Sequence, residues 1–347
     1  MTRRGNLCLA VSVVAVLAAP ARAQPAADAV VQTVDAVGLT VGNLDRSIAF
    51  FRDVLSFAVV GENEVTGSGL ETLEGVFGAH VRNARLKLGG ESIVLTEYLA
   101  PRGRPIPGDA RSNDRGFQHL AIVVSDMDRA YRHLREHGVK YVSTEPQTLP
   151  AWNKAAAGIK AFYFADPDEH TLEVIFFPPG KGDPRWQAPS TAPSTAQSTA
   201  LFLGIDHTAI GVGDTARSLR FYRDALGFRV AGQSDNHGTE QEHLNGVFGA
   251  HLRITALRAK AGPGIEFLEY LTPRDGRPAP SDLRANDLSH WQTFLKPRDV
   301  AAAVRGAVAA GGTQTSAAVV ELDDPLFKTR KAVLARDPDG HGLLFTQ

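Results

Sequence analysis

In the stretch that decides the fold, the chain reads Ile205-Asp-His-Thr-Ala-Ile-Gly-Val-Gly-Asp-Thr-Ala-Arg-Ser-Leu-Arg-Phe-Tyr-Arg-Asp-Ala-Leu-Gly-Phe228. This pattern predicts a short apolar strand, a turn, and an amphipathic helix that ends near a glycine. An earlier copy runs from Val34 to Phe57, and its helix, residues 45–57, matches residues 216–228 at seven of thirteen positions. An offset of 171 relates the copies. Such repetition predicts a chain built from equivalent folding units.

Each copy is followed by further repeated elements. After the first copy we expect a polar loop beyond Val60, a short helix over residues 70–78, and strands at 81–88 and 93–99. A second unit has an apolar strand at 117–124, a helix at 126–137, and strands at 161–165 and 171–177. The second half repeats this order. The sequence therefore predicts four strand–helix–strand–strand–strand (βαβββ) units.

Composition limits the classes of function. The 347 residues are 43% hydrophobic and 22% charged, with a net charge of −1, which is typical of a globular protein and disfavours a nucleic-acid or anionic-membrane partner. Residues 1–23 have the pattern of a signal peptide, with Arg3 and Arg4, an apolar run and a small-residue cleavage site before Gln24. We therefore expect a periplasmic or secreted protein with no membrane anchor after cleavage. The only cysteine, Cys8, lies in that segment.

The boundaries of the two halves follow from a change in composition. Residues 179–200 are rich in Pro, Ser, Thr and Ala, which predicts a low-complexity linker with little packing of its own. This divides the mature chain into a first domain at 33–178 and a second domain at 201–347. The oligomeric state cannot be read from these features.

The repeated strand and helix, with Asp166-Pro-Asp-Glu-His170 and Asp337-Pro-Asp-Gly-His341 before the last strands, resemble the vicinal oxygen chelate superfamily. That superfamily includes glyoxalase I, bleomycin-resistance proteins and extradiol dioxygenases. The resemblance implies an α+β fold in which four βαβββ units form two cup-shaped domains. It also implies a divalent metal, such as Zn, Ni, Fe, Mn or Co, bound by side chains from the first and last strand of each unit.

Only some of the positions that the resemblance implies as ligands hold metal-binding residues in this chain. The two middle units supply metal ligands that the resemblance implies, namely His119, Glu173, His207 and Glu266. The outer units supply only Ala36 and Val94 in unit one and Gln292 and Leu344 in unit four. If units two and three share a cup, the protein has one four-ligand site and one blank cup. If neighbouring units pair instead, His207, Glu266 and Gln292, or His290 in place of Gln292, form a three-ligand candidate.

Two classes of function remain open at this stage. One is a metal-dependent lyase, isomerase or dioxygenase acting on a small carbonyl or hydroxy compound, with Glu173 or Glu266 moving a proton. The other is a metal-free protein that binds or sequesters a small molecule, which the blank cup favours. In both cases we expect a small-molecule partner.

Overall fold

The computed structural model describes residues 30–187, 200–324, 326–327 and 329–347. The predicted signal peptide, with Cys8, and residues 188–199 of the predicted linker lie outside the described residues. Within the described ranges, no helix is long and apolar enough to cross a membrane.

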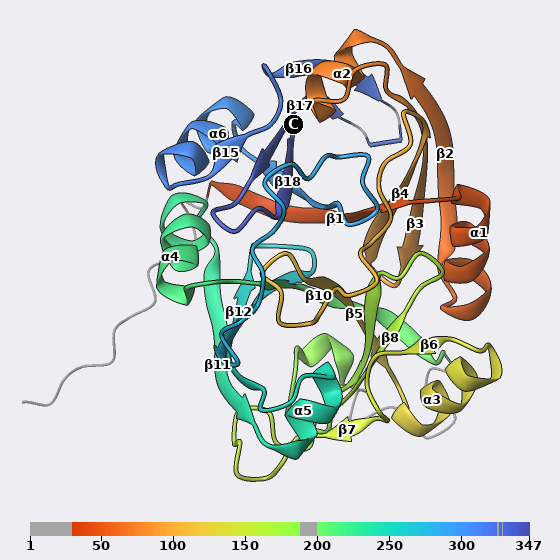
Figure 1. Cartoon of the computed structure of the whole chain (residues 1–347), viewed down its shortest axis with the longest axis vertical. Helices are drawn as coiled ribbons and strands as arrows, with labels where there is room; N and C mark the ends of the chain where they lie inside the picture. The colour runs from red at the N-terminus through yellow and green to blue at the C-terminus, as the bar shows by residue number, and fades with distance from the viewer. Residues whose placement is uncertain (1–29, 188–199, 325, 328) are drawn as a thin grey trace, which may run out of the picture.

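Four units of similar element order follow one another along the chain (Figure 1). Unit one contains β1 (Val31–Val41), α1 (Leu44–Ala49), β2 (Ala58–Thr66), α2 (Ser68–Glu74), β3 (His80–Leu88) and β4 (Glu91–Ala100). Unit two contains β5 (Gln118–Val124), α3 (Met127–Glu136), β6 (Lys140–Tyr141), β7 (Gln147–Thr148), β8 (Lys160–Ala165) and β9 (Thr171–Phe176). The predicted unit order is thereby confirmed for the first half.

The second half repeats this order. Unit three contains β10 (Phe202–Gly211), α4 (Thr215–Leu219), β11 (Arg229–His237), α5 (Thr239–Asn245), β12 (His251–Arg258) and β13 (Gly264–Thr272). Unit four contains β14 (Trp291–Pro297), α6 (Val300–Ala309), β15 (Thr313–Gln314), β16 (Val320–Asp324), β17 (Thr329–Arg336) and β18 (Gly342–Thr346). In units one and three the first helix continues into a π-helical turn, at Phe50–Val54 and Arg220–Ala225.

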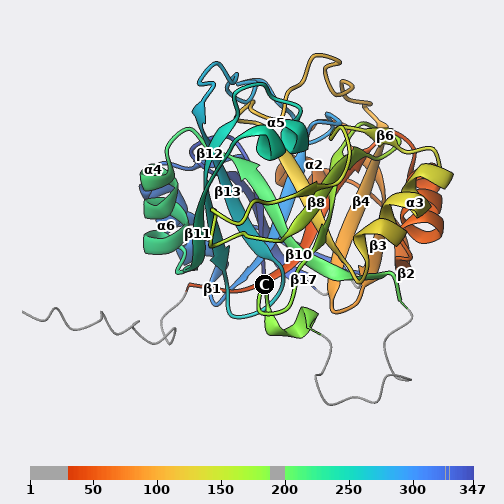
Figure 2. The ribbon, with the colours of Figure 1, turned by 90° about the horizontal axis from the view of Figure 1, so that it is seen from below.

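The units pair in the crossed arrangement. One nine-stranded sheet runs β15-β17-β18-β14-β1-β4-β3-β2 and joins units four and one, with β16 beside β17. The other runs β11-β12-β13-β10-β5-β9-β8-β6 and joins units three and two, with β7 beside β8. At the two centres, β1 lies antiparallel to β14 and β10 lies antiparallel to β5. Each curled sheet therefore takes one unit from each half of the sequence (Figures 1 and 2).

The same local signal starts the first helix of every unit. Asn43, Asp126, Asp214 and Asp299 each accept a hydrogen bond from the backbone N–H three residues later. Such side chains satisfy an amide that the first helical turn leaves unpaired, at a gain of about 1 kcal/mol. Each helix is thus fixed directly after the first strand of its unit. That strand carries the first ligand position implied by the resemblance.

Two regions differ from the sequence-based expectation. The polar segment after Val60 is not a loop but the continuation of β2, an edge strand that pairs only with β3. Its mostly exposed, polar residues follow from that edge position, because an edge strand faces water along one side. The start of the linker also packs more than its composition indicates. Residues Pro184–Trp186 form a 3-10 turn, Arg185 pairs with Glu91 of β4, and Trp186 packs against the sheet of units two and three.

Candidate metal and active site

All four side chains that the resemblance implies lie in one cup, on the sheet of units two and three. His119 is on β5, Glu173 on β9, His207 on β10 and Glu266 on β13. These are the four central strands of that sheet, so the backbone holds each position on both sides. The ring centroids of His119 and His207 are 5.7 Å apart, which excludes the arrangement with the two histidines in separate cups.

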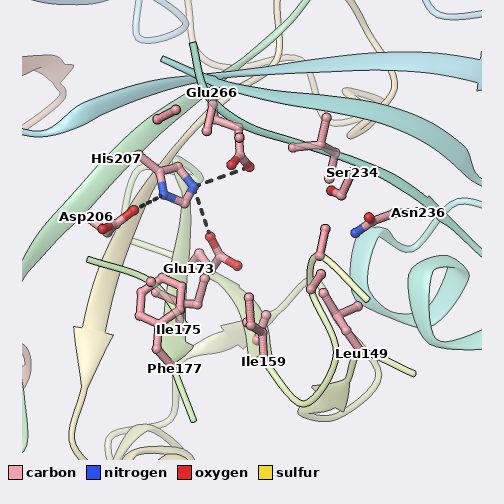
Figure 3. Close-up of a pocket in the computed structure, with 18 of the residues that line it drawn as sticks. Leu149, Ile159, Glu173, Ile175, Phe177, Asp206, His207, Ser234, Asn236 and Glu266 are labelled. Carbon is pink, nitrogen blue, oxygen red and sulfur yellow. Dashed lines mark hydrogen bonds and ion pairs between the residues drawn. The ribbon is translucent and has the colours of Figure 1, made fainter. Parts of the chain in front are cut away.

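Three of the four residues form a compact group. One potential ligand atom from each of His119, Glu173 and His207 lies within 4.8 Å of the other two, and all three residues are buried. Glu173 Oε2 is 3.1 Å from His119 Nε2 and 3.6 Å from His207 Nε2. Glu266 approaches from the other side, with Oε1 3.6 Å from His207 Nε2 (Figure 3).

Both histidines have buried nitrogens without a hydrogen bond to any described residue. These are Nδ1 and Nε2 of His119 and Nε2 of His207. Buried polar atoms nearly always have a hydrogen-bond partner, so an Nε2 without a hydrogen bond on each of two neighbouring imidazoles, facing a carboxylate, suits coordination of an ion. The donor set of two imidazoles with one or two carboxylates fits a divalent transition metal.

Asp206 fixes the orientation of His207. The His207 Nδ1–H donates to Asp206 Oδ2 at 2.9 Å, which leaves Nε2 facing Glu173 and Glu266. Asp206 also accepts from Trp186 Nε1 at 2.7 Å and, with both oxygens, from Arg258 at 2.8 Å. A carboxylate behind a coordinating imidazole fixes its tautomer and raises its basicity.

The charges around His207 favour a cation. Burial acts to lower the pKa of the imidazole, but the carboxylates of Glu266, Asp206 and Glu173 outweigh it and raise the pKa to about 9. Burial likewise acts to raise the pKa of Asp206, but the hydrogen bond from His207 and the charge of Arg258 hold it well below its usual range. The site thus concentrates negative charge that either a proton on His207 or a metal ion compensates. The residues present fit a divalent metal.

A cavity of about 470 Å³ opens above this group, with walls of different character (Figure 3). Unit two supplies an apolar wall made of Leu149, Ile159, Ile175 and Phe177. Unit three supplies a polar wall that includes Ser234, Asn236 and Gln241. The cavity has the size expected for a small-molecule site.

Tyr163 lies beside the metal candidate. This buried residue of β8 stands opposite Glu173 in the neighbouring strand, and its ring centroid is 4.7 Å from that of His119. Burial, together with the charges of Glu173 and Glu266, raises the pKa of the phenol well above its usual value. The hydroxyl therefore remains protonated at neutral pH and can donate a hydrogen bond. Neither Tyr163 nor Asp206 was predicted as a site residue.

Among the residues that the structure describes, the other cup has no comparable group. Its equivalent positions, Ala36, Val94, Gln292 and Leu344, are buried, and the three apolar ones belong to one hydrophobic cluster. The cavity there measures about 60 Å³. His290 is buried near Gly342 in the same half of the molecule, and burial lowers its pKa to about 3. The three-ligand candidate of His207 and Glu266 with Gln292 or His290 is therefore wrong, because Gln292 lies on β14 of the other sheet and His290 directly precedes that strand.

Comparison with known proteins gives a consistent family match. The model of the Glyoxalase/Bleomycin resistance protein/Dioxygenase superfamily matches residues 33–174 and 204–345. A 2-epi-5-epi-valiolone epimerase from Actinomyces sp is 34% identical over 149 residues, which are 42% of this chain and 79% of that protein. The uncharacterized protein YaeR from Escherichia coli (strain K12) is 29% identical over 131 residues, 37% of this chain and 83% of that protein.

Solved structures of similar fold span nearly the whole chain. Glyoxalase I from Zea mays superposes with a TM-score of 0.54 at 17% identity, covering 91% of this chain and 92% of its own. A putative dioxygenase from Bacillus subtilis has the same TM-score at 14% identity, covering 91% and 85%. At such identities the likeness concerns the fold.

Proposed function

The chain belongs to the glyoxalase/bleomycin resistance protein/dioxygenase superfamily, and we propose that it is a divalent-metal-dependent enzyme that moves a proton next to the carbonyl group of a small hydroxycarbonyl compound. The observation that carries this proposal is the meeting of His119 and His207, from opposite halves of the chain, beside Glu173. His119, His207 and Glu173 would hold the metal, with Glu266 as a fourth ligand or a free base.

When bound, a divalent metal supplies a Lewis acid that polarises neighbouring substrate oxygens and makes the adjacent carbon more acidic. Glu266 is the better placed base. Its side chain is 20% exposed whereas that of Glu173 is 6% exposed, and Glu173 is also close to both histidines. The substrate C–H bond breaks, the proton passes to the Glu266 carboxylate, and the electron pair moves into the carbonyl group as an enolate.

The two carboxylates come from different strands and flank His207 from opposite sides (Figure 3). A proton returned from water to the other face of the same carbon inverts that centre, and Glu266 then releases its proton to the solvent. A proton returned to the neighbouring carbon gives an isomer instead. The 34% identity to a protein named as an epimerase favours inversion.

The test is solvent exchange. Protein loaded with Zn, Ni, Mn or Co is incubated in deuterated water with a panel of hydroxy ketones, and deuterium uptake next to the carbonyl is followed by NMR. We expect metal-dependent uptake on at least one compound. No uptake with any metal would overturn the proposal. Oxygen consumption with iron(II) and catechols would assign a dioxygenase, since two histidines and one carboxylate also suit iron(II). Purification without stoichiometric metal under metal-replete conditions would assign a binding protein.

We also propose that the enzyme acts outside the cytoplasm, in the periplasm or after secretion. The support is the signal-like pattern of residues 1–23, with its small-residue cleavage site.

A further inference from the structure

A row of buried amide side chains crosses the seam between units two and three. It consists of Asn153 from the loop before β8, Asn236 at the end of β11, and Gln241 and Asn245 from α5, and we call it the amide row. Their exposures are 6%, 3%, 2% and 2%. A buried amide group costs free energy unless it is hydrogen-bonded. The hydrogen bonds of these four side chains therefore show which way each amide points.

The backbone fixes the first amide. Asn153 Oδ1 accepts from the N–H of Ala156 at 3.3 Å, and its Nδ2 donates to the carbonyl of Asp235 at 3.2 Å. The same Nδ2 donates to Asn236 Oδ1 at 2.7 Å. A flipped Asn153 amide would place its oxygen against the Asp235 carbonyl and its nitrogen against the Ala156 N–H. Asn236 must therefore present its oxygen to Asn153 and its nitrogen to the next residue.

This orientation passes along the row. Asn236 Nδ2 donates to Gln241 Oε1 at 3.0 Å, and Gln241 Nε2 donates to Asn245 Oδ1. An amide nitrogen carries two hydrogens, so Asn236 and Gln241 each keep one N–H that the row does not use. Both residues line the cavity above the metal candidate. Asn245 ends the row. Its Nδ2 atom is buried beside the Tyr163 hydroxyl but makes no hydrogen bond of normal geometry.

The row thus gives the polar wall a fixed set of neutral N–H donors. The nearby Ser234 hydroxyl adds another polar group, and Asn236 faces the cavity opposite Ile159 (Figure 3). The cation Arg258 also lines the cavity but binds both oxygens of Asp206. Arg229 also lines the cavity, but the amide row itself carries no charge. Its neutral N–H groups suit hydroxyl and carbonyl oxygens on this part of the wall.

We propose that the amide row is a specificity element that binds substrate oxygens remote from the metal. This inference rests on the proposed function and names its substrate class. The substrate is a polyhydroxylated carbonyl compound that directs its hydroxyl oxygens to the unit-three wall and a hydrocarbon face to the unit-two wall. A compound without those hydroxyls leaves the uncommitted N–H groups of Asn236 and Gln241 unpaired and is rejected.

The test compares two probes that share a six-membered ring and a hydroxy-ketone group. These are 2-hydroxycyclohexanone and 2,3,4,5,6-pentahydroxycyclohexanone, and their dissociation constants for the zinc-loaded protein are measured by calorimetry. We expect the pentahydroxy compound to bind at least about tenfold more tightly, the effect of one or two added hydrogen bonds. In Asn236→Leu this preference should disappear while the bound zinc remains.

The matched control is Asn83→Leu. Asn83 is a similarly buried amide of β3 in the other cup, and it donates to Asn63 at 3.1 Å. The control should keep the preference, which separates recognition from general destabilisation. If Asn236→Leu does not fold, Ser234→Ala replaces it and should weaken only the pentahydroxy probe. Equal binding of both probes to the native protein, or an unchanged preference in the wall variants, would overturn the inference while leaving the proposed function intact. If the native protein binds no zinc, the proposed function is rejected instead.

Discussion

The Nε2 atom of His207 lies 3.6 Å from Oε2 of Glu173, although the two residues belong to opposite halves of the repeated sequence. This contact exists because β10 pairs with β5, which in turn pairs with β9. Each half of the chain supplies one unit to the site. Neither half alone contains both histidines.

The first prediction concerns the orientation of His207. Asp206→Asn should weaken metal binding by about 10–100-fold without unfolding the protein, because the imidazole loses the charged partner that fixes its tautomer. Competition with a calibrated chelator measures this change. Asp35→Asn is the matched control, since Asp35 is the equivalent residue of unit one and pairs with Arg85 and Lys296. Equal metal affinity in native protein and Asp206→Asn would contradict the assigned role.

The second prediction concerns the base. Glu266→Gln should lower the rate of deuterium exchange into substrate by about 10²–10⁴-fold, because an amide cannot accept the proton. The fold should persist, and metal should remain bound through His119, His207 and Glu173. Glu269→Gln, three positions along β13, controls for loss of a carboxylate from the same strand. Native exchange rates in Glu266→Gln would shift the base role to Glu173.

The third prediction concerns the pH dependence of stability and involves the other cup. Burial raises the pKa of the Glu74 carboxyl to about 7, although the Tyr98 hydroxyl and Arg336 act to lower it. Between pH 4.5 and 7 the unfolded chain releases this proton while the folded chain keeps it, so Glu74 makes the fold less stable as pH rises.

Glu74→Gln should therefore stabilise the protein at pH 8 by up to about 3 kcal/mol and have little effect at pH 4.5, as judged by urea unfolding. The exposed Glu136→Gln controls for removal of one negative charge. A Glu74→Gln variant with the same pH profile as the native protein would show that the carboxyl ionises normally in the fold.

The fourth prediction concerns export. Expression of the full chain in a Gram-negative host should place a protein that begins at Gln24 in the periplasm, because the cleavage pattern ends at Ala23. Mass spectrometry of the fractionated cells gives the mature N-terminus. Recovery of the uncleaved chain from the cytoplasm would contradict export.

The units were predictable because they rest on local patterns, and the four candidate ligand positions followed from the resemblance of those units to the vicinal oxygen chelate superfamily. His119 and His207 stand in the first strands of their units, and the repeat made those strands comparable. The crossed pairing was left open, since it depends on contacts between distant segments such as β5 and β10.

Other features had no usable local signal. Strand alternation places Asp206 on the face opposite His207, but a register irregularity between Ile205 and His207 brings its carboxylate beside the imidazole. The members of the amide row come from three separate segments and meet only in the folded chain. The strand β2 was missed because its edge position removes the apolar alternation of a half-buried strand.

The measurement that tests the central claim most directly is the metal content of the purified mature protein and three variants under metal-replete conditions. The account predicts one divalent metal per native chain, its loss in both His119→Ala and His207→Ala, and its retention in Gln292→Ala. One shared site requires a histidine from each half. Retention of metal with native affinity in either histidine variant, or two metals per native chain, would contradict the account.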